Sequence, residues 1–313
     1  MVIRASCNDL LLVSPHLDSW THIYYICNPI TRQFYQLPEI PQTDRYLACS
    51  GQALICMPNN EFKIVVLGRL RNSIRVCSQN VMIFSSKTGT WESKCLEYPN
   101  PRERRGVHWL EMITCNGVVY WLEHDFYMNR VLSLDLRNDN KVGTLDFPDD
   151  YWWYPRRTMD LRKHHRIRGG FKGDHVKTQI GVVSGELWLL QFVNTSVKGM
   201  INLKAWRLNN GSEWILVEDR KNLKDPVNKE GEEEFVGGFT HPLNNEALIL
   251  VWGRNIFEYN LMDGSLEILG VLQEYIKVSN YAWYKDERLV CIPVMPPTWL
   301  MALRPHHRAS KSL

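Results

Sequence analysis

Residues 24–38 read YYICNPITRQFYQLP, and this stretch decides the fold class. Its first four residues are aromatic, β-branched or small and apolar, which favours a β-strand. Asn28 and Pro29 end the run, because the asparagine side chain bonds the backbone ahead and proline fixes φ for a turn. Alternation resumes over residues 33–37 and ends at Pro38. The stretch therefore predicts two strands joined by a tight turn, a β-hairpin.

The same pattern returns four times along the chain. It is found in NVMIFSSKTGTWESKCLEYP (80–99), RVLSLDLRNDNKVGTLDFP (130–148), LKAWRLNNGSEWILVED (203–219) and NIFEYNLMDGSLEILGVL (255–272). The turns are roughly 50 to 70 residues apart, which is the spacing of propeller blades with variable loops. Other apolar runs between the hairpins bring each unit to about four strands.

The repeat predicts an all-β protein, a β-propeller of about six four-stranded blades with an incomplete closing blade. A pair of β-sandwiches is the alternative. We assign residues 1–300 to the propeller domain and residues 301–313 to a polar C-terminal tail. The run RLVCIPVM (288–295) is expected to lack a strand partner, which would leave an exposed sheet edge.

The composition limits the class of protein. The 313 residues are 44% hydrophobic and 23% charged, enough to bury a core, and the net charge of +3 does not by itself imply a polyanionic partner. No run of apolar residues is long enough to predict a membrane span, and the N-terminus does not read as a secretory signal. Eight scattered cysteines without a C-x-x-C pair favour a reducing compartment, so we expect the cytoplasm, the nucleus or both.

Several short motifs, in order, resemble those of a known family. They are CNDLLL (7–12), CNPIT (27–31) followed by Leu37-Pro38, NGVVYWL (116–122), VLSLDL (131–136) and the pair Trp206 and Ser212-Glu213-Trp214. Together they are similar to the plant F-box associated domain, whose members have kelch-like architecture. The resemblance covers about residues 5–275. It implies a substrate receptor of a cullin-RING ubiquitin ligase, in which an F-box docks to a Skp-type adaptor and the propeller selects the target.

The resemblance implies a protein-binding domain whose partners are target proteins for ubiquitination. The helical F-box expected ahead of Cys7 is missing from this chain, so adaptor and cullin are expected as partners only if the full product carries one. We find no nucleotide-binding loop and no nucleophile motif. The acidic pair at 149–150 and the acidic run at 232–234 could bind a cation but are expected to be solvated loop charges. The histidine pairs at 164–165 and 306–307 lack the further ligands that a zinc site needs. We therefore predict no enzyme activity, no cofactor and no metal.

The most unusual segment is DDYWWYPRRTMDLRKHHRIRGGFKGDH, residues 149–175. Its candidate partner-binding residues are Tyr151, Trp152, Trp153, Tyr154, Arg156, Arg157, Arg162, Lys163 and Arg166. Aromatic and arginine side chains anchor protein interfaces, which makes a protein-binding loop one interpretation. A nucleic-acid-binding propeller using residues 151–172 is the alternative, since aromatic faces stack on bases while arginines neutralise phosphates. A nuclear-import patch is a third interpretation. The fourth is a partly disordered basic loop whose aromatic residues only cover the domain edge.

Two further segments carry charge. Residues 218–235, EDRKNLKDPVNKEGEEEF, are of mixed sign and are expected to form a solvated, mobile connection. NPRERRGVH (100–108) is a second basic connector. If it shared a face with the aromatic-basic segment, that face would favour an acidic partner, and the sequence alone does not decide this.

Overall fold

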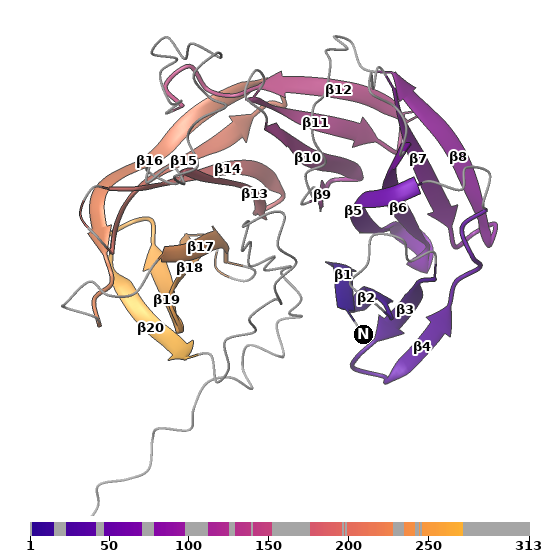
Figure 1. Ribbon diagram of the computed structural model, residues 1–313, viewed down its shortest axis with the longest axis horizontal. Coiled ribbons are helices and arrows are strands. Elements are labelled where there is room, and N and C mark those ends of the chain that lie inside the picture. Colours follow the sequence, from indigo (N-terminus) through magenta and orange to yellow (C-terminus); the bar gives the residue numbers. More distant parts are fainter. Residues whose placement is uncertain are drawn as a thin grey trace, which may run out of the picture.

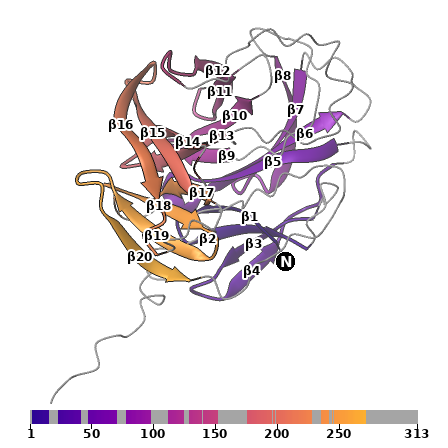
Figure 2. The ribbon, with the colours of Figure 1, turned by 60° about the vertical axis from the view of Figure 1, so that its left-hand side comes forward.

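The computed structural model places five four-stranded antiparallel sheets around a common centre, in the order of the sequence (Figures 1 and 2). It describes residues 2–15, 23–41, 47–70, 78–97, 112–124, 129–138, 140–151, 176–195, 197, 199–227, 235–241, 244 and 246–271. Each sheet is one blade, and within every blade the strands are hydrogen-bonded in sequence order. This is the all-β propeller that the repeat predicts.

The blades are numbered 1 to 5 along the chain. Blade 1 has β1 (Val2–Cys7), β2 (Leu10–Ser14), β3 (Tyr25–Asn28) and β4 (Gln33–Gln36). Blade 2 has β5 (Leu47–Cys56), β6 (Phe62–Leu70), β7 (Ser78–Ser85) and β8 (Thr90–Glu97), with a short 3₁₀ turn, η1 (Pro58–Asn60). Blade 3 has β9 (Met112–Cys115), β10 (Val118–His124), β11 (Asn129–Asp135) and β12 (Lys141–Asp146).

The last two blades complete the described arc. Blade 4 has β13 (Val176–Val183), β14 (Glu186–Asn194), β15 (Met200–Asn209) and β16 (Glu213–Lys224). Blade 5 has β17 (Phe235–Thr240), β18 (Ala247–Trp252), β19 (Asn255–Asn260) and β20 (Leu266–Val271). The first strand of each blade lies nearest the centre and the fourth lies at the rim (Figure 1).

All five predicted hairpins are confirmed, and each one supplies the third and fourth strands of a blade. The expected number of blades is wrong: the described residues form five blades rather than about six. Five hairpins correspond to five blades, whereas a sixth rested on residues 288–295, which lie outside the described residues together with the tail at 301–313.

The expectation that residues 218–235 form a mobile connection is wrong for their first part. Strand β16 continues through this charged run to Lys224, and its pairing with β15 shifts register twice on the way. Leu223, near the end of the strand, faces inward and is buried against blade 5. A rim strand needs few apolar residues, so its alternating charges resemble a loop in sequence.

Strand β17 reads FVGGFT, and its two glycines hide it from a sequence pattern. Packing explains Gly238, because a β-carbon added there would lie 2.6 Å from the Leu250 side chain and 2.7 Å from the Phe192 ring. The inner strand of blade 5 therefore approaches its neighbours more closely than any larger residue would allow.

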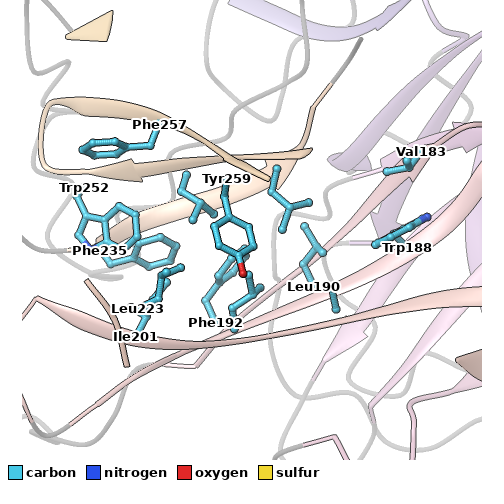
Figure 3. Packing of buried hydrophobic residues seen from close by; sticks show 14 residues of the cluster. Val183, Trp188, Leu190, Phe192, Ile201, Leu223, Phe235, Trp252, Phe257 and Tyr259 are labelled. Atoms are coloured by element: carbon cyan, nitrogen blue, oxygen red, sulfur yellow. The ribbon is translucent and has the colours of Figure 1, made fainter. Parts of the chain in front are cut away.

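The core consists of apolar layers between neighbouring blades. Four clusters of buried side chains fill the four junctions between consecutive blades. Figure 3 shows the layer between blades 4 and 5, where Phe192, Phe235, Trp252 and Phe257 bring their rings together. The middle strands are buried on both faces, as β14 is from its second residue to its eighth, since each blade is covered by a neighbour on either side.

Candidate partner-binding face

The sheet order gives the propeller two different faces. The inner strands of neighbouring blades run in the same direction, as contacts near their C-terminal ends show. The Thr114 hydroxyl donates to the Leu54 carbonyl, and the Cys115 thiol donates to the Gly185 carbonyl. The turns between first and second strands and between third and fourth strands therefore share one face, here the turn face. The links from second to third strands and from each blade to the next share the other, here the connector face.

This topology answers the question that the sequence leaves open. Residues 98–111 link β8 to β9, and residues 152–175 link β12 to β13, so both basic segments leave and re-enter the propeller on the connector face. The remaining long links, residues 16–22, 71–77, 125–128 and 228–234, attach to the same face. The turn face carries short turns, such as the type I′ turn with Asn116 at φ 49° and Gly117 at φ 75°.

Of the predicted partner-binding residues, the structure describes Tyr151. The other eight, Trp152, Trp153, Tyr154, Arg156, Arg157, Arg162, Lys163 and Arg166, lie outside the described residues. The Tyr151 side chain is only 8% exposed and packs between blades 3 and 4. Its ring centre lies 4.6 Å from that of Phe147 and 5.9 Å from that of Trp206. Tyr151 therefore anchors the start of the segment and leaves little of its own surface for a partner.

The two ends of the aromatic-basic segment are held next to each other. The hydroxyl of Tyr151, at one end, is hydrogen-bonded to the hydroxyl of Thr178, just past the other. Burial raises the pKa of Tyr151 above its ordinary value, against the opposing effect of hydrogen bonds to Thr178 and Gln191. The phenol is therefore neutral at physiological pH. Its hydrogen bond to Thr178 means that the long insertion between blades 3 and 4 begins and ends at one point of the propeller.

A charged contact reinforces the first end. The Asp150 carboxylate accepts hydrogen bonds from Lys204 Nζ at 2.9 Å and from the indole nitrogen of Trp206 at 2.9 Å. Partial burial would raise the pKa of Asp150, but the bonds from Lys204 and Trp206 and the lysine charge outweigh it and hold the pKa below its usual value. The sequence predicts a solvated acidic pair at 149–150 and gives no sign of this contact, because Lys204 and Trp206 lie more than 50 residues away along the chain.

A lysine fixes the second end. Lys177 Nζ donates to the backbone carbonyls of Phe235 at 2.8 Å and Val236 at 2.7 Å, and lies 5.7 Å from the centre of the Phe235 ring. These contacts tie the start of β13 to the inner strand of blade 5. The segment is thus mounted on a rigid base of blades 3, 4 and 5, as binding loops on stable scaffolds generally are.

The described residues contain neither a candidate metal cluster nor a candidate membrane-spanning helix. Within them, no group of three or more His, Cys, Asp or Glu side chains is placed to share a metal ion. Nor does any helix there have the length and apolarity needed to cross a membrane.

Comparison with known proteins gives the chain a family. The family model described as F-box protein At3g26010-like, beta-propeller, matches residues 1–275. F-box protein At3g26010 of Arabidopsis thaliana is 23% identical over 284 residues, an alignment that covers 86% of this chain and 58% of the relative. The chain thus spans less than two thirds of that relative's length.

Solved propellers also resemble it. The Dos1 propeller matches with a TM-score of 0.45 at 10% identity, covering 87% of this chain and 59% of that one. A puromycin hydrolase mutant, S511A, matches with a TM-score of 0.48 at 11% identity, covering 86% of this chain and 39% of that one. At these sequence identities and TM-scores, the two likenesses give no information about activity.

Proposed function

Because this chain belongs to the At3g26010-like family of F-box protein β-propellers, we propose that it is a non-catalytic domain that selects target proteins for a cullin-RING ubiquitin ligase. The observation that carries the proposal is the mounting of residues 152–175, whose two ends are tied together on the connector face through Tyr151 and Thr178. Function in repeat scaffolds is concentrated in loops held on one face.

The chemistry of the segment favours an acidic target surface. Between residues 152 and 175 the sequence has seven Arg and Lys side chains and two Asp, next to three consecutive aromatic residues. Aromatic and arginine side chains supply most of the energy at protein interfaces. Excess positive charge steers an acidic partner toward the face and selects against basic ones. The basic connector at residues 98–111 attaches to the same face and adds to this preference.

Assembly with the rest of a ligase is a separate part of the proposal. A Skp-type adaptor and a cullin would join only where an F-box is present in the full product. The chain then supplies the target-binding half, in the cytoplasm or the nucleus. This part rests on the family alone, because the chain spans 58% of the length of its Arabidopsis relative.

The test begins with capture of partners by the tagged chain from a nuclease-treated plant extract, followed by mass spectrometry. An identified partner is then purified and its affinity for the chain is measured at two salt concentrations. We expect a protein partner whose binding weakens as salt rises, since exposed charges contribute. Reversing three charges with Arg162→Glu, Lys163→Glu and Arg166→Glu should remove most of the binding.

A matched control reverses three charges on the turn face, Arg32→Glu, Lys87→Glu and Lys141→Glu, which lie in or beside hairpin turns of blades 1 to 3. This variant has the same net charge as the first and should bind the partner as the unmodified chain does. Equal losses in both variants would overturn the connector face as the site. Partners that are captured from an untreated extract and are absent after nuclease treatment would overturn protein recognition and favour nucleic acid.

A further inference from the structure

The inner strands of the first three blades all end in cysteine. Strands β1, β5 and β9 end at Cys7, Cys56 and Cys115, so the three thiols lie at equivalent places on the turn face near the centre of the propeller. Cys115 donates its thiol proton to the Gly185 carbonyl of blade 4. Cys7 and Cys56 instead meet each other across the junction between blades 1 and 2.

Their contacts are reciprocal. The backbone N–H of Cys56 donates to the Cys7 sulfur at 3.2 Å, and the Cys56 thiol donates to the Cys7 carbonyl at 3.2 Å. Each sulfur therefore lies against the other residue's backbone, on strand ends that belong to different sheets. A disulfide needs α-carbons within about 7 Å of each other, and the two 3.2 Å contacts place these residues side by side across the junction.

The surroundings make one of the two sulfurs the nucleophile. Hydrogen bonding from the Cys56 thiol lowers the pKa of Cys7 to about 7, against the opposing effect of burial and with help from the Cys56 backbone. The pKa of Cys56 is raised, first by its hydrogen bond to Cys7 and then by burial. Cys7 is thus partly thiolate near neutral pH while Cys56 keeps its proton. Both side chains are only partly buried, which leaves them open to a small oxidant.

We propose that Cys7 and Cys56 form a reversible disulfide between blades 1 and 2 when the protein meets hydrogen peroxide. The Cys7 thiolate attacks one peroxide oxygen, the O–O bond breaks, and hydroxide leaves and is protonated to water. The sulfur of Cys56 then attacks the sulfenic acid on Cys7, the S–O bond breaks, and a second water leaves with the Cys56 proton. Two thiols and one peroxide give one disulfide and two waters, and a dithiol reductant reverses the change.

The bond would fasten the innermost strand of blade 1 to that of blade 2. The two cysteines are 49 residues apart, so the disulfide closes a long loop and restricts the unfolded chain more than a short one would. Oxidation is therefore expected to stabilise the first two blades. The inference stands independently of the proposed target-binding function, because the pair lies on the turn face.

Peptide mapping of the full chain tests the pair. The reduced protein is treated with a small excess of hydrogen peroxide, free thiols are alkylated under denaturing conditions, and fragmentation spectra locate any linked residues. We expect a Cys7–Cys56 linked peptide, about 2 Da lighter than its two reduced parts, that disappears on treatment with dithiothreitol. The melting temperature of the unmodified chain should rise on oxidation and fall back on reduction.

Variants separate this pair from general thiol oxidation. Cys7→Ser and Cys56→Ser should each abolish the linked peptide and the rise in melting temperature. Cys115→Ser is the matched control, with the same position in its blade but a carbonyl as partner, and it should behave as the unmodified chain. Recovery of both thiols unmodified, or a linked peptide that persists in Cys7→Ser, would overturn the proposal. If either serine variant failed to fold, the map of the unmodified chain would still decide.

Discussion

The junction between blades 1 and 2 and the junction between blades 3 and 4 are closed by the same device. At the rim of the first, the indole nitrogen of Trp91 donates to the carbonyl of Pro38 at 2.7 Å. At the rim of the second, that of Trp214 donates to the carbonyl of Asp146 at 2.9 Å. In both junctions, a tryptophan on the fourth strand of one blade donates to a backbone carbonyl at or just after the end of the fourth strand of the preceding blade.

Behind the rim the two junctions differ. The first is apolar and aromatic, with Phe84 5.3 Å from Trp91 and Tyr24 6.4 Å from it between ring centres. The second places a carboxylate, Asp150, against the indole of Trp206. The link between blades 1 and 2 is ten residues long, whereas residues 147–175 separate blades 3 and 4. A long insertion needs fixed ends. Hydrogen bonds from polar side chains hold those ends in a defined orientation, which apolar packing does not impose.

The largest effects should come from the buried rings at the two junctions. Trp206→Ala and Phe84→Ala should each cost about 3–5 kcal/mol, the usual range for removing a buried aromatic side chain. Hydrogen exchange should show Trp206→Ala lowering protection in blades 3 and 4, and Phe84→Ala in blades 1 and 2. Equal loss of protection in all blades for both variants would mean that the junctions are not separate units.

A smaller effect should come from the two rim tryptophans. Trp91→Phe and Trp214→Phe keep a ring and remove the N–H donor, so each should cost about 1 kcal/mol, the net value of an ordinary hydrogen bond. Urea denaturation of both variants gives the comparison. Similar losses would confirm that the two rims use the same device, and a loss at one rim alone would contradict it.

The smallest effect, and the one most specific to the second junction, should come from Asp150→Asn. The pKa of Asp150 is lowered in the folded protein, so its contribution is present above the unfolded value, about 3.9, and is lost as pH falls through the folded pKa. The side chain is 47% exposed, so solvent screening limits the contribution to below about 1 kcal/mol.

The measurement is stability against pH from 7 to 2 for the unmodified chain and for Asp150→Asn. The variant should start lower at pH 7 and lose less stability on acidification, and added salt should reduce the difference between the two. Asp263→Asn is a useful comparison from blade 5, because bonds to Ser265 within its own turn also lower the pKa of Asp263, and its loss should leave the junction between blades 3 and 4 unchanged. An identical pH profile for Asp150→Asn and the unmodified chain would show that the charged contact does not contribute to stability.

The hairpins were the predictable part of this protein. Turn residues and strand alternation are local, so five outer hairpins and the propeller class could be recognised from short stretches such as residues 24–38. Strand β17 and the end of β16 could not be recognised in this way, because they are stabilised by contacts with residues far away in the sequence. Gly238 is explained by Phe192, more than 40 residues earlier, and Leu223 is buried by the next blade. The blade count failed for a related reason, since no local pattern states how a ring closes.

The candidate site was predictable in composition and not in placement. The sequence identifies residues 149–175 as unusual, but it gives no sign that Tyr151 turns inward or that Asp150 binds Lys204. Neither does it place the connectors at 98–111 and 152–175 on one face, which follows only from strand direction in neighbouring sheets.

The strand order of the blades also bears on how the chain is made. Every sheet consists of four consecutive strands, and every apolar cluster joins a blade to the next one along the chain. Each blade can therefore pair its strands as soon as its own residues have left the ribosome, with no need to wait for a distant partner strand. Synthesis would then add finished blades one at a time, each covering the apolar face left exposed by the one before.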